Sequence, residues 1–481
     1  WNAAYENAGG YRDYNGSESL FLAPSLTWHL SPDTTLSLLG EYHRYDYVFD
    51  RGLLAVPQAL QVPGSRFLGE PENFARTNAW RVAYELTHKF NDVWQLRSAL
   101  GSIFSEQLSQ FAQPYEVAAD GRTVLRQATA RHEHSANYTL QNEVSGSFRT
   151  GQMEHQILIG VELGRYEFEY EIGFQEMASI DFFAPVYDAP LPRAPYDDLD
   201  GYGADSLGFY LQDQVTLSAQ WKLLAGLRHD TVKTEETLSG VHHTVDALSP
   251  RLGLVYQPWA PVSLFAGWSR SFTPNFGIAA GGESFKPEEG EQLEGGIKLD
   301  LLKDKLAATL AVYEITKENV LAADPFRPEF VIATGGQKSR GMEFELAGSP
   351  VPGWNVALNY ACTDAFVSRD SEITSGTALP MVPRHQAGLW ASYEWQSGPL
   401  KGFGLGTGLY FASTRSASLT VDPVILPSYC RWDAALFYKR ENWSAQVNFK
   451  NLTSERIYQG QGALIYPDPL LQIQASLTLK F

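Results

Sequence analysis

Cysteine is almost absent from this sequence: only Cys362 and Cys430 occur among its 481 residues. Two cysteines cannot build a disulfide framework, and no cysteine pair or Cys/His set has the spacing of a zinc site. Both cysteines lie in stretches with an apolar face. We therefore expect two isolated thiols that behave as small apolar side chains.

Positive charge is scarce as well. Lys and Arg total 37 against 55 for Asp and Glu, which gives a net charge of -18. Nucleic-acid binding needs a basic surface that displaces counterions, so no nucleic-acid partner is expected. No run of about 18 apolar residues occurs, which excludes a membrane-spanning helix. A membrane-spanning β-barrel stays possible, because its polar lumen keeps the mean hydropathy low.

Linear catalytic motifs are also missing. The sequence has no nucleophile elbow, phosphate-binding loop or dinucleotide-binding glycine pattern. Its histidine clusters, His132-Glu133-His134 and His242-His243, lack the i, i+4 spacing of a zinc protease helix. We expect no enzyme activity, no catalytic residue, no metal site and no cofactor. The chain begins at Trp1 with no signal-peptide pattern, so we expect a mature chain or a fragment.

Alternation between apolar and polar residues is the main pattern that is present. At the C-terminal end, Phe481, Leu479 and Leu477 share one face, while Lys480 and Thr478 share the other. The same period recurs in stretches such as 22–30, 36–42, 293–300 and 443–450. Alternating segments of about ten residues match a bilayer, whereas strands of soluble sandwiches usually have about five or six. Counting such segments predicts about twenty strands.

The connections between these segments alternate between short and long. Short turns are expected at 31–33, 91–92, 150–151, 257–258, 303–304, 398–399 and 441–442, and long polar stretches at 46–78, 106–136 and 175–206. Outer-membrane barrels have short turns at the periplasmic end and long loops outside. The sequence therefore predicts an all-β fold, a large antiparallel transmembrane β-barrel of outer-membrane type.

Several motifs carry a resemblance to a known family. They are SPRLGLVYQP at 249–258, WSRSFTPN at 268–275, QLEGGIK at 292–298, SRGME at 339–343, VPRH at 382–385 and KNL at 450–452. In their order and spacing they resemble the TonB-dependent ferric-siderophore receptors of the ferrichrome type. The resemblance runs over nearly the whole chain.

The resemblance implies most of the functional expectations. Residues 1–481 would form the barrel domain, with about 20 of an expected 22 strands and without the N-terminal plug. The chain would sit in the cell outer membrane and import an iron(III)-siderophore chelate, of hydroxamate type. Expected partners are the TonB energy-transducing complex acting through the plug, outer-membrane lipid and lipopolysaccharide, and the barrel-assembly machinery. Phe481, Leu479 and Leu477 would form the C-terminal assembly signature.

A bulky chelate calls for an aromatic-lined outer vestibule with a few polar groups. Candidate ligand contacts are loop aromatics, namely Phe111, Tyr115, Phe174, Phe182, Phe183, Tyr187, Tyr196, Tyr202 and Tyr466. The alternative is that these aromatics pack the loops onto one another or lie at the lipopolysaccharide boundary.

Two further stretches concern the lumen. Glu167, Glu169 and Glu171 share a face, which would be an acidic ladder able to pair with Arg228 or the plug if it faced the lumen, or otherwise a solvated wall. The glycines at 404, 406 and 408 also share a face and leave room for a close neighbour such as the plug.

Three other functions stay open at this point. Without a plug the chain would be a passive pore. The same architecture also serves receptors for cobalamin or haem, and a haem receptor would use loop histidines such as His132, His134, His242 and His243. A soluble all-β binding protein would instead bury the alternating face as its core.

Overall fold

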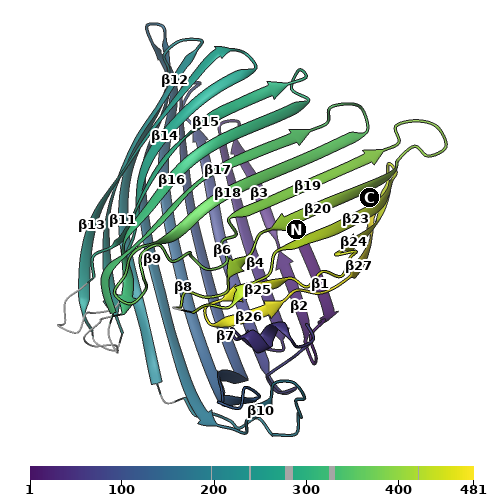
Figure 1. The fold of residues 1–481 in the computed structure, drawn as a ribbon. Helices are drawn as coiled ribbons and strands as arrows, with labels where there is room; N and C mark the ends of the chain where they lie inside the picture. The colour runs from purple at the N-terminus through teal and green to yellow at the C-terminus, as the bar shows by residue number, and fades with distance from the viewer. Residues whose placement is uncertain (197, 238–239, 277–284, 324–330, 421, 481) are drawn as a thin grey trace.

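The computed structural model describes the whole chain except residues 197, 238–239, 277–284, 324–330, 421 and 481. Figure 1 shows one large curved sheet of tilted antiparallel strands, with smaller elements near the ends of the long strands. The long strands are β1 (Asn2–Gly9), β2 (Gly16–Ala23), β3 (Ser25–Ser31), β4 (Thr34–Tyr47), β6 (Phe74–Lys89), β7 (Trp94–Val117), β8 (Thr123–Thr150), β9 (Met153–Glu176), β11 (Asp198–Thr216), β12 (Trp221–Glu236), β13 (His242–Trp259), β14 (Val262–Thr273), β15 (Glu288–Leu301), β16 (Leu306–Ala323), β17 (Val331–Gly348), β18 (Trp354–Arg369), β19 (His385–Glu394), β20 (Phe403–Ala412), β23 (Tyr429–Lys439), β24 (Trp443–Lys450) and β27 (Gln472–Leu479).

The smaller elements belong to the connections. They are β5 (Leu53–Leu54), the 3-10 helix η1 (Pro57–Leu60), β10 (Ile180–Asp181), β21 (Arg415–Ser416), β22 (Ile425–Leu426), β25 (Tyr458–Gln461) and β26 (Leu464–Pro467). No helix among the described residues is long and apolar enough to cross a membrane. Cys362 and Cys430 are free thiols.

Pro24 interrupts what is otherwise one strand. β2 and β3 both pair with β4 in the same register, and the Gly40 amide donates to the Pro24 carbonyl between them at 3.0 Å. Proline has no N–H to donate, so the ladder breaks there without changing direction. The sheet has 22 strands, so joining β2 with β3 and setting the two-residue β10 aside leaves 20 in the described chain. The predicted strand number is confirmed.

The pairing runs in chain order from β1 to β27. β1 pairs with β2, and β27 pairs with β24. Among the described residues no ladder joins β1 to β27. The sheet therefore has two free edges, one formed by each of these strands.

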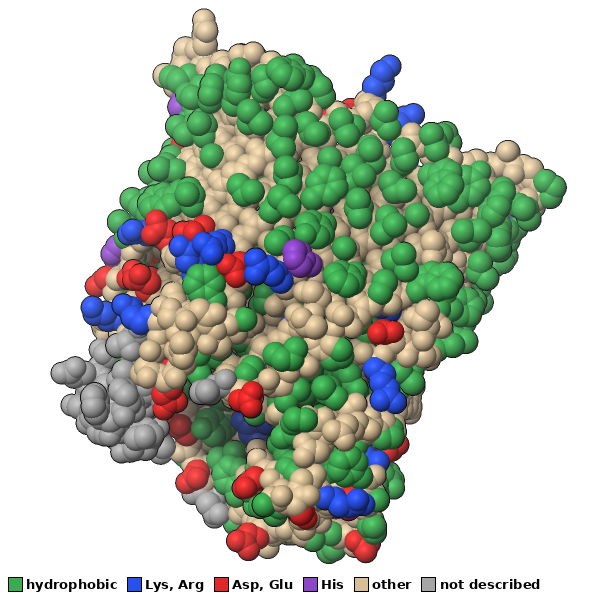
Figure 2. Space-filling model, in the orientation of Figure 1, with side chains coloured by type: hydrophobic (Ala, Val, Ile, Leu, Met, Phe, Trp, Pro, Cys, Tyr) green, Lys and Arg blue, Asp and Glu red, His purple; other side chains and the backbone are tan. Residues whose placement is uncertain are grey.

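Exposed apolar side chains cover the outer face of the wall. On β27, Ile473, Leu477 and Leu479 share one face, opposite Phe449, Ala445 and Trp443 of β24 in register, as the alternation predicts, although every residue of the strand is exposed. Phe481 of the same pattern lies outside the described residues. Figure 2 shows hydrophobic side chains spread over the face in view, with a row of charged side chains beside them. An apolar band of this kind faces lipid in a membrane barrel.

Most long connections lie at one end of the wall and most short turns at the other, as expected, but several predicted bounds are wrong. β6 begins at Phe74 within the stretch 46–78, and β11 begins at Asp198 within 175–206. The stretch 106–136 is not a loop: β7 and β8 extend through it and leave only residues 118–122 as a turn. The turn expected at 257–258 lies at 260–261, because β13 continues to Trp259. Strand residues outside the bilayer have no lipid-facing side, so their sequence loses the alternation that would have identified them.

A buried apolar cluster of the described chain lies mainly in the connections rather than in the wall. It joins β5, η1, β10, β22, β25 and β26 with Val124 at the start of β8. Its members are Leu53, Leu54, Ala59, Val62, Leu68, Val124, Ile180, Phe182, Ala417, Leu426, Tyr458 and Ile465. We call this set the loop core. It packs parts of the connections between β4 and β6, β9 and β11, β20 and β23, and β24 and β27 against one another.

Candidate ligand-binding vestibule

A buried ion pair fastens two of these connections to β8. Arg126 lies 2.8 Å from Glu70, and their side chains are 1% and 2% exposed. Arg126 also donates to the carbonyls of Leu68, Gly69 and Ala178 at 3.0–3.2 Å. Burial raises the pKa of the Glu70 carboxyl, and the Arg126 guanidinium opposes that shift. The long β7–β8 hairpin thus supports the loops on both sides of it.

Five of the nine predicted ligand-contacting aromatics serve the packing of loops. Phe182 belongs to the loop core, and Phe183 and Tyr187 pack against it. The Tyr187 hydroxyl donates to the Phe67 carbonyl at 2.8 Å. Phe111 is fully buried and stacks on Phe49 at 4.2 Å between ring centroids, and burial raises the pKa of Tyr466. For these residues the structure agrees with the alternative, in which aromatics fold the loops onto one another.

The other four candidates are accessible but lie apart. Tyr115, Phe174 and Tyr196 are exposed, and Tyr196 lies beside the ring of His132 with 6.3 Å between centroids. Tyr202 belongs to an aromatic group with Tyr166, Phe168 and Phe276. The nine residues therefore do not form one surface, and ligand contact stays a prediction.

The group around Tyr202 lies on the inner face of the wall. On β9, Ile159 and Leu163 point outward, so Tyr166 and Phe168 point inward by the two-residue period of a strand. Tyr202 is opposite Phe168 in register, with ring centroids 5.4 Å apart, and Phe276 lies 4.3 Å from Tyr202. We call Tyr166, Phe168, Tyr202 and Phe276 the inner aromatic cluster. In the sequence, the cluster is indicated only by the alternation of Tyr166 and Phe168 with the glutamates beside them, which puts the two rings on one face of the strand.

The acidic ladder is on the opposite face, which agrees with the second reading, a solvated wall, and not with a ladder in the lumen. Glu167, Glu169 and Glu171 share the parity of Leu163 and point outward. Arg228 does not pair with any of them: it lies 2.8 Å from Glu162 and 2.6 Å from Asp230. The sequence showed which residues share a face but not which face is inside.

A polar network covers the inner wall between β6 and β12. Arg97 lies 2.8 Å from Glu85 and 3.0 Å from Glu143. The Tyr210 hydroxyl donates to Glu143 at 2.7 Å, and Arg228 lies over the Tyr210 ring at 5.3 Å. Both signs of charge alternate along this network, so it is a polar lumen lining rather than a surface of one sign.

Gly404, Gly406 and Gly408 share one face of β20 and form what we call the glycine stripe. The side chains closest to it belong to neighbouring strands of the wall. A Cβ atom at Gly404 would lie 2.2 Å from the ring of Phe437 on β23, and one at Gly406 would lie 2.6 Å from Trp390 on β19. These inward-facing rings occupy the space that the glycines leave free. The expectation that the stripe marks a plug contact is therefore replaced by an aromatic packing within the sheet.

Comparisons with known proteins agree with this architecture. The family model for the TonB dependent receptor-like β-barrel matches residues 25–452. A metal-pseudopaline receptor of Pseudomonas aeruginosa is 33% identical over all of this chain, which spans 70% of that protein. The ferrioxamine B receptor of Salmonella typhimurium is 26% identical over 93% of the chain, which spans 66% of that protein. The ferrichrome outer membrane transporter and phage receptor of Escherichia coli is 28% identical over 80% of this chain and 56% of its own length.

Solved structures share the fold. The siderophore receptor PiuA of Acinetobacter baumannii superposes on 99% of this chain with a TM-score of 0.86 at 21% identity, and 76% of its own chain is covered. The ferric preacinetobactin receptor BauA of the same organism superposes with a TM-score of 0.87 at 19% identity, covering 99% of this chain and 74% of its own. The family match spans most of the chain, and the wall has the strands, outward apolar band and segregated loops that the family implies. The chain therefore belongs to the TonB-dependent receptor β-barrel family of outer-membrane proteins.

Proposed function

We propose that this chain is the barrel of a receptor that takes up a metal chelate of siderophore type across the outer membrane. The inner aromatic cluster carries the proposal, because it gives the inner wall an apolar, polarisable surface for a bulky chelate, with polar groups on the same face of the wall. The relatives named above, which are receptors for metal-pseudopaline, ferrioxamine B and ferrichrome, support this substrate class.

Import of the chelate would need energy coupling. In our proposal residues 1–481 act as one barrel domain, and the TonB complex acts through a separate plug segment. Outer-membrane lipid, lipopolysaccharide and the barrel-assembly machinery complete the set of proposed partners. The chelate is cargo, so the proposal includes neither a resident cofactor nor catalysis.

A ferric hydroxamate is the first chelate to test. The resemblance in the motifs points to that type, whereas the Pseudomonas relative extends the class to other metal chelates. The receptor, purified from outer membranes in detergent, is titrated with ferric hydroxamate, ferric catecholate, cobalamin and haem while tryptophan fluorescence is followed. Saturable quenching by a siderophore chelate at submicromolar concentration is the expected result.

Uptake of the same radiolabelled chelate then tests the coupling. Cells with and without TonB are compared, and accumulation only in the former supports energy-coupled import. Conductance in planar bilayers that does not depend on ligand, without saturable chelate binding, would replace the proposal with a passive pore. Saturable binding of cobalamin or haem alone would keep the receptor and change its substrate.

A further inference from the structure

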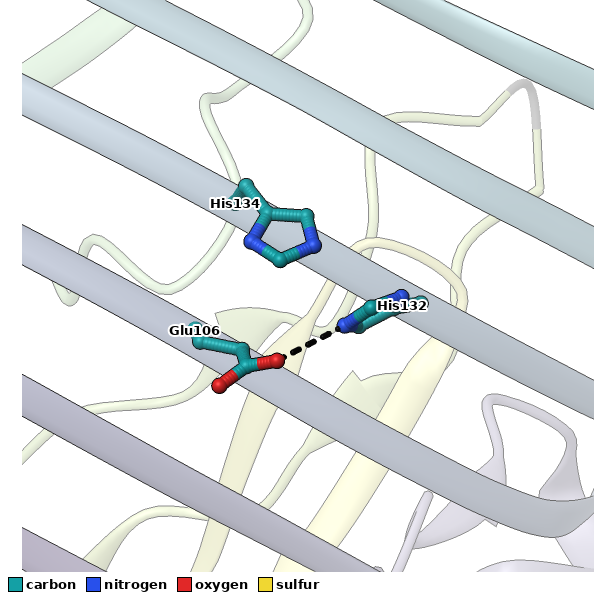
Figure 3. A group of neighbouring side chains, drawn as sticks. All are labelled: Glu106, His132 and His134. Carbon is teal, nitrogen blue, oxygen red and sulfur yellow. Dashed lines mark hydrogen bonds and ion pairs between the residues drawn. The ribbon is translucent and has the colours of Figure 1, made fainter.

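Two histidines and a glutamate meet on the outer side of the tall β7–β8 hairpin. His132 and His134 are two residues apart on β8, so both side chains project from one face of the strand. Figure 3 shows their rings beside the carboxylate of Glu106 on β7. One ligand atom from each of the three residues lies within 4.8 Å of the others.

Strand register, rather than loop conformation, sets this geometry. Glu106 is opposite His134 across the β7–β8 ladder, and Glu171 is opposite His132 across the β8–β9 ladder. His132 Nε2 lies 3.0 Å from Glu106 Oε1, and its Nδ1 lies 3.4 Å from Glu171 Oε2. The centroids of the two imidazole rings are 4.2 Å apart.

The group is separate from the inner aromatic cluster. Its residues on β8 share the parity of Tyr138 and Phe148, which are exposed on the outer face. Glu171 likewise lies on the outward face of β9. The side chains of His132 and Glu106 are 27% and 42% exposed, so an ion in the medium can reach them.

No lysine or arginine among the described residues lies within ion-pair distance of the Glu106 or Glu171 carboxylate. Within the part of the chain that the structure describes, His132 is the one basic side chain within 4.0 Å of the carboxylates of Glu106 and Glu171. The nearby Arg131 points to the opposite face and pairs with Glu133 at 2.7 Å. Two imidazoles beside two carboxylates, none of them paired with a lysine or arginine among the described residues, favour the binding of a cation.

We propose that Glu106, His132 and His134 bind a divalent transition-metal ion, with Zn²⁺ as the probe, and that Glu171 orients His132. Imidazole nitrogen and carboxylate oxygen are ligands for zinc, nickel and copper, and three protein ligands leave a fourth position for water. Ligand bonds are about 2.0–2.2 Å long, so the three atoms must close in by short side-chain rotations. These partly exposed side chains have the freedom to do so.

Glu171 supplies the outer partner that such sites require. With the metal on Nε2, the Nδ1–H of His132 donates to Glu171, which fixes the tautomer and ring orientation. The ion would then connect β7, β8 and β9 outside the apolar band. The expected consequence is a metal clip across the three strands, independent of any chelate in the lumen.

Zinc binding by the receptor purified in detergent tests the site. The protein is stripped with a chelator, dialysed against Zn²⁺ without any siderophore, and analysed for bound metal. We expect one equivalent with the wild type, loss of that equivalent with His132→Gln/His134→Gln, and at least tenfold weaker binding with Glu106→Gln. Glu171→Gln is expected to weaken binding less, because it does not touch the ion.

The double variant His242→Gln/His243→Gln is the matched control. These two residues are adjacent on β13, so their side chains lie on opposite faces and cannot chelate together. It should keep the zinc equivalent. Absence of stoichiometric zinc in the wild type, or its retention by folded His132→Gln/His134→Gln protein, would overturn the proposal.

Circular dichroism verifies that each variant keeps its strands, and the isosteric Glu106→Gln variant covers the case in which the double variant fails to fold. Chelate uptake is measured in parallel and should be unchanged in all of these variants. Failure of uptake with intact zinc binding would refute the proposed function and leave this site standing.

Discussion

The Arg126–Glu70 ion pair is buried beside the loop core, so its loss should destabilise the connections that form this core. Removing one member of a buried pair leaves the other charge unpaired, which typically costs about 3–5 kcal/mol. We expect Arg126→Met to loosen the connections 48–73 and 177–197 and to speed their cleavage by protease several-fold.

Two further variants test this account of Arg126. The double change Arg126→Met/Glu70→Gln should recover most of the loss, because no buried charge is then left alone. Arg122→Met removes an exposed pair with Asp181 and is expected to cost about 0–1 kcal/mol. Equal protease sensitivity of Arg122→Met and Arg126→Met would contradict the importance given to burial.

Asp120 offers a pH test at the tip of the same hairpin. Its carboxylate accepts the Thr123 hydroxyl at 2.6 Å and the backbone amides of Thr123 and Arg122 at 2.9 Å, and these bonds lower its pKa to about 2. A pKa below the usual value means that the turn is stabilised at neutral pH and loses this contribution as the pH falls from about 4 toward 2.

Carbon NMR of a labelled carboxyl group measures this titration directly. Asp120 should titrate near pH 2, and Asp120→Asn should remove the signal and relax the turn. A midpoint near 4 would show that the hydrogen bonds do not favour the ionised form in solution.

At the scale of a strand, the two faces of β11 predict different consequences. Tyr202→Ala removes the centre of the inner aromatic cluster, and we expect chelate affinity to fall roughly tenfold, about 1–2 kcal/mol. Leu199→Ala on the outward face of the same strand is the control and should leave affinity unchanged. Fluorescence titration of both variants with ferric hydroxamate compares them, and equal affinity would place the ligand elsewhere.

The glycine stripe of β20 predicts a packing defect. A side chain at position 406 would meet the Trp390 ring, so Gly406→Leu should lower the free energy of unfolding by about 1–3 kcal/mol. Leu405→Val on the neighbouring lipid-facing position should cost less. Denaturant unfolding in detergent compares the two, and a larger effect at 405 would argue against contact between the stripe and Trp390.

Strand alternation explains both the successes and the misses of the sequence interpretation. It identified the apolar face of β27 and the number of strands, because lipid imposes apolar residues on every second position. It did not identify residues 106–117 of β7 and 123–136 of β8, where no lipid imposes that pattern. It also set His132 and His134 aside for lacking helical spacing, although a spacing of two on a strand places them on one face.

At the scale of the whole molecule, the wall and the loop core are held by different forces. The wall is held by backbone ladders and by lipid against its outer face, whereas the loop core is a small apolar interior in water. Denaturant should therefore give two transitions, with the loop core unfolding first. Protease sensitivity of residues 48–73 and circular dichroism of the strands distinguish them, and coincident transitions would show that the two parts unfold together.

The candidate vestibule was harder to predict than the fold, because its residues lie in connections whose packing depends on contacts between segments far apart in the sequence. The positions of Phe182 and Phe111 depend on which distant loops pack together, and the local sequence does not show these contacts. Their aromatic character fits ligand contact and loop packing equally well. Only the three-dimensional arrangement separates them from Tyr202.

The loop core has an evolutionary consequence. Loops on most scaffolds can vary freely because no other part of the fold packs on them, but here segments that connect the long strands also form the interior of a small apolar unit. A lineage that changes its cargo by altering Phe182 would lose folding stability, whereas one that alters Tyr115 or Phe174 would not. Divergence in specificity should accordingly follow the exposed aromatics and spare the packed ones.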